Sequence, residues 1–580
     1  MRYIKKAMLI SSAIIAVNST LNANCDIKYS DNRVHYADEH NPQNHIITLN
    51  YKNMELLDLK YIEGSTNHHA DPMGELNKAK YMMLVPKGSY FVHFYDLKNG
   101  NFVKKIRLPF KPRSADAYNA KYNLVFLNSR NRPAGVLIDV DKLEIVGKIG
   151  FNIECSTNKP SVKQLWNVYS YKENFDKNYQ CLPVDFGGDQ ISGHPIWISD
   201  NALALIDRAN RMIHVYQITP NKNGNYDTKK IQTFKTDTSL HQLIPQSKDR
   251  NNKIFYGMTE GNGIENLTAG VYKFEVKHNR LKKIAFTKLK NNNYYGTNGH
   301  NLYITPDKKY LYAPAGALLK EESQNYGYDW ISRHNKHKRL DKNYENFVKL
   351  FLRENIDKNE IKNYYKVKKL FNKYSQIDGY TPKYIPSKQH YMANNYYKKQ
   401  YTLIPNGSIF VIDTKSMKVV KKIAAGKGAG HVAFSEQKGI AVVTNHLDDF
   451  LTLIDYKHHK FLQNVYLDFE HENIFNLSQS HMQYISKDGN YYYNFWSDGG
   501  VFFRLNLNDL SIDRAVYVGG IPIQGNFYEH IDSNCNYPAP SLDDGFDKYF
   551  NIDNITDTFD NQERSFRSFF SRFSSIKSRD

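Results

Sequence analysis

The sequence is poor in cysteine and lacks the motifs of several enzyme classes. Four cysteines occur among 580 residues, and none lies in a C-x-x-C-H motif, which excludes a covalently attached c-type haem. The chain has no G-x-S-x-G elbow, no H-E-x-x-H helix and no phosphate-binding loop. The glycines near Gly426 precede a strand-like segment rather than a helix, so they do not indicate a phosphate site.

Long apolar runs are also missing beyond the N-terminus. A positively charged start, an apolar stretch over 7–17 and the small residue Ala23 predict a signal peptide at 1–23. The apolar stretch is too short to span a bilayer, and no later segment indicates a transmembrane helix. Cys25 leaves a lipoprotein alternative, but Asn24 before it fits a lipid-attachment box poorly. We therefore expect a soluble product exported to the periplasm.

Acidic residues are fewer than basic ones. The chain has 59 Asp and Glu against 78 Lys and Arg, a net charge of +19. Such a charge suits nucleic acid, an anionic surface or a small anion steered by the field. No recognition helix, RNA-binding motif or clustered basic arm occurs, so we expect no nucleic-acid partner. A solvated basic surface is the plainest interpretation.

The even cysteine count predicts disulfides in an exported protein. We favour a Cys155–Cys181 pair across a local loop and a Cys25–Cys535 pair joining the two ends of the chain. Three pairings can be drawn, and the sequence does not choose among them.

Internal repetition is the main positive signal. Hydrophobic residues make up 41% of the chain and aromatics 14%, enough for a large core of pleated strands. Five segments align on a histidine that opens a hydrophobic strand, at His194, His241, His300, His431 and His481. A turn and three further strands follow each histidine. A four-stranded unit of roughly 45–50 residues is the size of a propeller blade.

Two earlier units complete the set. One starts at His68 and His69, and the next near Asp116 has no histidine at its start. The sequence therefore predicts an all-β fold, a seven-bladed β-propeller over 24–535. We expect the strand at 46–49 to pair with the last blade and close the ring, because closure leaves no exposed edge.

One segment, 318–400, breaks the repeat. It lies between the second and third strands of the fifth blade, and its charged, partly helical pattern predicts a helical insertion. We expect it to form a lid beside the histidines. The polar tail 536–580 is expected to form a short packing helix or to be disordered.

The histidines themselves are the candidate site. The first residue of each innermost strand faces the mouth of the central channel, so one residue type repeated there converges on the axis. The predicted metal ligands are His68, His69, His194, His241, His300, His431, His481 and His530. Imidazole suits copper and zinc, and so many imidazoles exceed the four ligands of one structural zinc ion. An all-nitrogen set in an oxidising compartment favours a multinuclear copper site.

A structural role for these histidines is the competing interpretation. Many propellers open blades with Gly-His, where the histidine bonds within the blade, and Gly193-His194, Gly299-His300 and Gly430-His431 match that pattern. No tryptophan is followed by aspartate, so the Trp-Asp part of that network is missing. Five further histidines are expected to be ordinary strand or surface residues: His93, His214, His446, His458 and His459.

The repeat and the histidine series resemble the seven-bladed copper propellers, namely thiocyanate dehydrogenases and the N-terminal domain of nitrous oxide reductase. The resemblance covers roughly residues 40–535. His68-His69 resembles the paired histidines of nitrous oxide reductase, and His300, His431, His481 and His530 resemble the late histidines of both families.

That resemblance implies a copper-dependent oxidoreductase acting on a small, anionic molecule, with a periplasmic electron acceptor as a further partner. No cupredoxin domain follows the propeller, so thiocyanate-type oxidation is the closer analogy. The second blade lacks its histidine, where Asp116 could substitute. Asp116 and Asp189 are also candidates for a general base or for a group that supports the metal ligands. The alternative is a metal-free propeller that serves as a binding or scaffold module.

Overall fold

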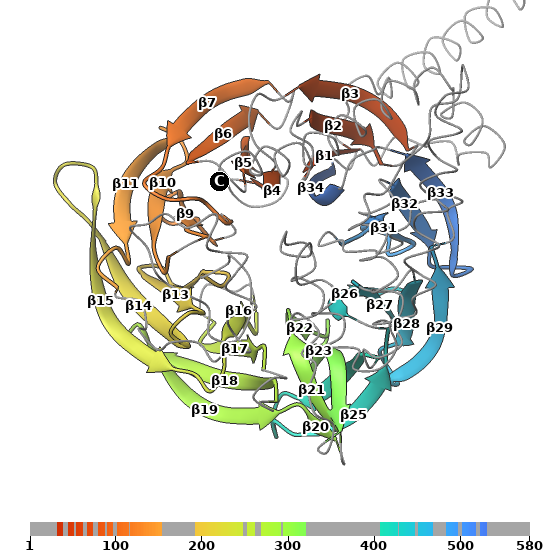
Figure 1. Ribbon diagram of the computed structural model, residues 1–580. Coiled ribbons are helices and arrows are strands. Elements are labelled where there is room, and N and C mark those ends of the chain that lie inside the picture. The colour runs from red at the N-terminus through yellow and green to blue at the C-terminus, as the bar shows by residue number, and fades with distance from the viewer. Residues whose placement is uncertain are drawn as a thin grey trace, which may run out of the picture.

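The protein is described here by a computed structural model covering residues 32–529, apart from 154–191, 321–405, 468–482 and short segments between strands. The described residues form strands and no helix, and the strands make eight antiparallel sheets. Figure 1 shows the sheets standing side by side around a ring, in chain order. The prediction of an all-β propeller is confirmed. No helix among these residues is long and apolar enough to cross a membrane.

Each sheet is a blade, and its strands follow one another from the axis of the ring to its rim. The first four blades in chain order are β4 (Asn67–Pro72), β5 (Tyr81–Pro86), β6 (Phe91–Asp96) and β7 (Phe102–Arg107); β8 (Ala117–Asn119), β9 (Leu124–Asn128), β10 (Gly135–Asp139) and β11 (Glu144–Ile149); β12 (Ile196–Ser199), β13 (Ala202–Asp207), β14 (Met212–Pro220) and β15 (Tyr226–Lys235); and β16 (Leu240–Pro245), β17 (Ile254–Thr259), β18 (Gly270–Lys277) and β19 (Arg280–Lys288).

The next three blades complete most of the ring. They are β20 (Lys290–Asn291), β21 (Tyr294–Gly299), β22 (Tyr303–Ile304), β23 (Tyr310–Lys320), β24 (Ser408–Asp413) and β25 (Val419–Ala424); β26 (Ala429–Ser435), β27 (Ile440–Asn445), β28 (Phe450–Asp455) and β29 (Lys460–Tyr466); and β30 (Tyr484–Ile485), β31 (Tyr491–Trp496), β32 (Val501–Asn506) and β33 (Ser511–Tyr517).

The eighth blade corrects the predicted count of seven. It combines β1 (Asn32–Asp38), β2 (His45–Asn50) and β3 (Glu55–Tyr61) with β34 (Pro522–Glu529), and β34 pairs with β1. The strand at 46–49 does lie in the sheet that closes the ring with the C-terminal strand, but it pairs with β1 and β3 and not with the blade before it. The blade escaped notice because its inner strand comes from the other end of the chain, so no continuous segment contains the whole unit.

The fifth blade carries the insertion point. β23 pairs with β24, so the predicted insertion does connect the second and third strands of this blade. β23 extends to Lys320, so residues 318–320 belong to a strand and not to a helical insertion. The rest of 318–400 lies outside the described residues, as do the predicted signal peptide at 1–23, the four cysteines and the tail 536–580.

The core lies between neighbouring blades. Every residue of β9, β13 and β27 is buried, because a middle strand has a blade on each face. Met83, Phe94 and Leu127, for example, belong to one cluster between the first two blades. Outer strands such as β7 are largely exposed and carry lysines, which discourages edge-to-edge association. This packing fixes the inner strands and the residues at their ends.

Candidate functional site

Four predicted axial histidines lie against one another. His194 lies just before β12, His241 within β16, His300 just after β21 and His431 within β26. The ring centroids are 5.1 Å apart for His194 and His241, 4.3 Å for His241 and His300, and 5.0 Å for His300 and His431. These strands belong to four successive blades, so the repeated register brings together residues that are distant in sequence.

A fifth histidine, His446, belongs to the same group. Its ring stacks on His431 with centroids 5.0 Å apart, and it lies 5.4 Å from His300. The structure therefore places His446 against the axial histidines, which corrects its expected placement as an ordinary strand or surface residue. We call His194, His241, His300, His431 and His446 the axis cluster.

The other predicted ligands are placed less fully. The backbones of His68 and His69 lie in β4, with His69 opposite Val85, but their side chains lie outside the described residues. His481 and His530 also lie outside the described residues. Their role as ligands stays a prediction, and so do the suggested roles of Asp116 and Asp189, which fall in the same undescribed part.

The glycine before each of three cluster histidines permits a close approach between neighbouring segments of the backbone. A Cβ at Gly193 would lie 2.6 Å from the backbone oxygen of His241, and one at Gly430 would lie 2.7 Å from Nε2 of His446. The backbone N–H of His194 also donates to the carbonyl of His241 at 2.9 Å. The Gly-His pairs therefore reflect packing at the narrow end of the blades, whatever the histidines do.

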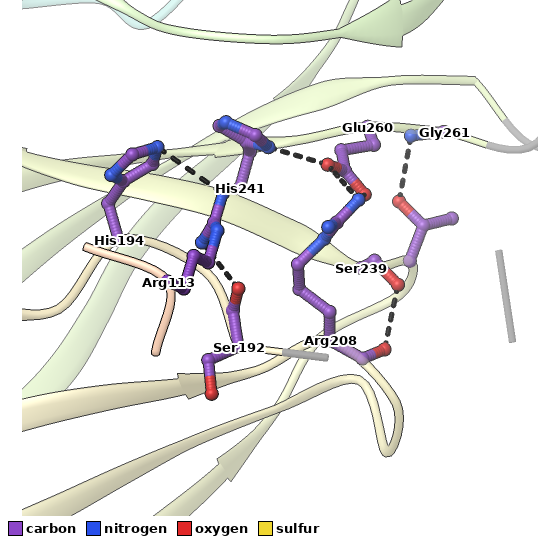
Figure 2. A network of polar contacts seen from close by, with 9 residues as sticks. Arg113, Ser192, His194, Arg208, Ser239, His241, Glu260 and Gly261 are labelled. Carbon is purple, nitrogen blue, oxygen red and sulfur yellow. Dashed lines mark hydrogen bonds and ion pairs between the residues drawn. The ribbon is translucent and has the colours of Figure 1, made fainter. Parts of the chain in front are cut away.

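A buried carboxylate holds His241. Nδ1 of His241 lies 2.7 Å from Oε1 of Glu260, and Nη2 of Arg208 lies 2.7 Å and 3.0 Å from the two oxygens of that carboxylate. All three residues are about 2% exposed. Figure 2 shows His241 with one ring nitrogen toward Glu260 and the other turned away from it. A carboxylate in this position fixes the orientation of the imidazole.

A second arginine lies at the other end of the cluster. Nη2 of the buried Arg113 lies 3.3 Å from Nε2 of His194, and its Nη1 donates to the backbone oxygen of Ser192 (Figure 2). A guanidinium can only donate, so Nε2 of His194 is the acceptor in this contact. This places a permanent positive charge beside the imidazoles.

Neutral polar groups hold His431. The Tyr303 hydroxyl lies 2.7 Å from Nδ1 of His431, and the Asn301 side-chain nitrogen lies 3.1 Å from the same atom. Burial raises the pKa of Tyr303 above its ordinary value, so this hydroxyl keeps its proton at neutral pH. Two of the cluster imidazoles are thus oriented by opposite kinds of partner, a carboxylate at His241 and a phenol at His431.

Three of the residues that sequence analysis missed share one position. Arg208, Glu260 and His446 each come directly after the second strand of a blade, at the ends of β13, β17 and β27. In an antiparallel pair, the end of the second strand lies beside the start of the first. A search of that register, as well as of the residues that open each blade, would have found them.

The cluster offers imidazole nitrogens, which copper and zinc both take as ligands. Within the described residues, however, no group of three or more His, Cys, Asp or Glu side chains is placed so that it could hold a metal ion. The axis cluster therefore offers suitable donor atoms without a formed coordination sphere, and metal binding would require the rings to turn.

Comparisons with known proteins give distant likenesses. No protein-family model and no curated protein matches the chain. One similar solved structure is the dihydro-haem d1 dehydrogenase NirN, with 11% identity, 86% of this chain and 74% of that chain covered, and a TM-score of 0.48. Another is AztD from Citrobacter koseri, with 10% identity, coverage of 85% and 96%, and a TM-score of 0.43. The periplasmic gluconolactonase PpgL of Pseudomonas aeruginosa has 10% identity, coverage of 86% and 99%, and a TM-score of 0.43. Likenesses this distant do not bear on function, and the fold rests on the sheets described above.

Proposed function

We propose that this chain is a periplasmic propeller that binds copper through the axis cluster and acts as an oxidoreductase on a small anion. The observation that carries the proposal is the contiguous set of five imidazoles contributed by four blades. Several neutral imidazoles without thiolate are a donor set that copper favours. His68, His69, His481 and His530 are proposed as further ligands.

The residues around the cluster support this role. Glu260 orients His241 in the way that carboxylates orient metal-bound histidines. The Arg113 guanidinium beside His194 would attract an anionic substrate, and the net charge of +19 would favour its approach. Bound copper would supply one-electron redox chemistry, and a periplasmic electron acceptor would complete turnover. The predicted signal peptide supports the location.

A metal-free propeller that acts as a binding or scaffold module is the second candidate. It is favoured by the finding that the described side chains do not converge on a metal position. In that case the axis cluster would be a packed polar plug at the narrow end of the blades, and copper would leave stability unchanged.

Metal content after copper loading separates the two candidates. Elemental mass spectrometry would be performed on periplasmically expressed protein with and without copper, followed by removal of loosely bound metal. We expect two or more copper ions per chain in the parent protein and a loss in the variant His300→Ala/His431→Ala. His458→Asn is the matched control, because His458 is exposed and bonds to Asp455 away from the axis. No copper in any of the three proteins would favour the metal-free candidate. Equal copper in all three would place the metal outside the axis cluster and would contradict the proposal.

A further inference from the structure

Glu260 fastens two histidines of the axis cluster at once. Its side chain accepts from Nδ1 of His241, and its backbone carbonyl accepts from the N–H of Gly299 at 3.0 Å. Gly299 directly precedes His300, whose ring is the one 4.3 Å from His241. One residue therefore sets the orientation of one imidazole and the backbone position of the next.

The neighbouring blades hold Glu260 in place. Its backbone N–H donates to the carbonyl of Ser239 at 2.8 Å, and the Ser239 hydroxyl donates to the carbonyl of Arg208 at 2.8 Å. The Arg208 side chain then returns to the carboxylate (Figure 2). These bonds cross from the β12–β15 blade to the β16–β19 blade, so the carboxylate cannot turn away without breaking contacts in both.

The carboxylate decides which nitrogen of His241 carries the proton. Glu260 bonds to Arg208 through both oxygens, as an ionised carboxylate does, and an ionised carboxylate only accepts hydrogen bonds. The proton of neutral His241 must therefore lie on Nδ1. The lone pair then lies on Nε2, which is turned away from Glu260 (Figure 2).

We infer that Glu260 is a positioning residue that holds His241 as the Nδ1–H tautomer and aims its Nε2 lone pair into the axis cluster as the primary metal donor. His194 differs, because Arg113 donates to its Nε2. The two neighbouring histidines are therefore inequivalent. His241 would offer its Nε2 lone pair to a cation, whereas Nε2 of His194 already accepts from a positively charged guanidinium. The metal part of this inference rests on the proposed function, whereas the tautomer does not.

The tautomer is measured by 15N NMR on metal-free protein with labelled histidine. The His241 signals are assigned by their loss in His241→Gln. We expect a protonated Nδ1 and an unprotonated Nε2 in the parent protein. A parent protein with the proton on Nε2 of His241 would overturn the inference, whether or not the protein binds copper.

The metal part is tested with the variant Arg208→Gln/Glu260→Gln, which removes both buried charges together. Loss of an outer-shell partner typically weakens metal binding by about 10–100-fold, and we expect a loss in this range in competitive copper titrations. Asp207→Asn is the control, since it alters a buried carboxylate–histidine contact outside the cluster. Unchanged copper affinity in the double variant would overturn the positioning role. If the parent binds no copper, the proposed function fails and the tautomer measurement alone decides the inference; it also decides if the double variant does not fold.

Discussion

Two buried histidine–carboxylate pairs lie in adjacent blades and differ in what the second ring nitrogen meets. In the blade interior, His214 has Nε2 3.1 Å from Asp207 and Nδ1 3.1 Å from the Thr233 hydroxyl. At the axis, His241 has Nδ1 2.7 Å from Glu260, and its ring faces the imidazoles of two other blades.

The difference shows that burial and a carboxylate partner do not by themselves mark a functional histidine. His214 has both ring nitrogens engaged by its own blade, which is sufficient for a structural role. His241 bonds to its blade through one nitrogen, and its other nitrogen is turned away from Glu260, in a ring that lies against two imidazoles of other blades.

The largest effect is expected from Glu260→Ala. Removal of the carboxylate leaves the charge of Arg208 buried without its partner, which typically costs about 3–5 kcal/mol. The free energy of unfolding in urea measures this loss. Arg208→Met/Glu260→Leu should recover most of it, because apolar residues can replace a buried ion pair at little cost. A double variant as unstable as Glu260→Ala would contradict the assignment.

Copper should stabilise the protein through the axis cluster and independently of the histidine in the blade interior. At a copper concentration 100 times the dissociation constant, binding adds about 2.7 kcal/mol to the stability of the folded state. We expect a rise of the melting temperature in the parent protein and in His214→Gln, and none in His241→Ala/His300→Ala. A rise of equal size in all three would place the copper elsewhere.

Asp207→Asn should be a purely structural change of smaller size. The amide cannot reproduce all the bonds that Asp207 makes with His214 and Asn210, and a loss of about 1–2 kcal/mol is expected from chemical unfolding. Copper stoichiometry should match that of the parent. Loss of copper from this variant would mean that the two carboxylate sites are coupled.

A methyl group at Gly430 tests the histidine that sequence analysis missed. The added Cβ of Gly430→Ala would meet Nε2 of His446 at 2.7 Å, so that ring must move off His431. We expect a loss of about 1 kcal/mol in stability, as for mild overpacking, together with weaker copper binding. A variant with parental copper affinity would show that His446 packs against the cluster without serving it.

The smallest effect is expected on the pKa of a buried tyrosine in the blade interior when Asp207 is replaced. Burial raises the pKa of Tyr216 from 10.0 to about 12, with Asp207 adding to the shift. The folded state therefore favours the neutral phenol; this stability is fully present below pH 10 and is lost as pH rises toward 12. Absorbance at alkaline pH would follow the ionisation, and Asp207→Asn should lower the pKa of Tyr216. An unchanged titration would contradict the electrostatic contribution.

The repeat itself made the propeller and the first residues of its blades predictable. A local pattern, Gly-His, combines a glycine that permits close backbone packing with a histidine at the axis. It occurs at Gly193-His194, Gly299-His300 and Gly430-His431. The eighth blade could not be predicted in this way, because β1 and β34 meet only when the ring closes. Its β1 also lacks a continuous apolar run, since polar and apolar residues mix along it.

The partners of the histidines were harder to predict for a related reason. The contacts of three of them, Arg208, Glu260 and His446, depend on the strand end where each residue lies. Nothing in the local sequence distinguishes these residues. Arg113 precedes β8 and reaches His194 across a blade boundary. Such contacts follow from the packing of neighbouring blades and cannot be predicted from any one segment of the sequence.

The most direct test of the central claim is a crystal structure of the copper-loaded protein with anomalous data collected at the copper edge. The account predicts anomalous peaks among the rings of His241, His300 and His431, within about 2.0–2.1 Å of imidazole nitrogens. Peaks confined to surface histidines such as His458, or an axis cluster without copper in fully loaded crystals, would contradict it.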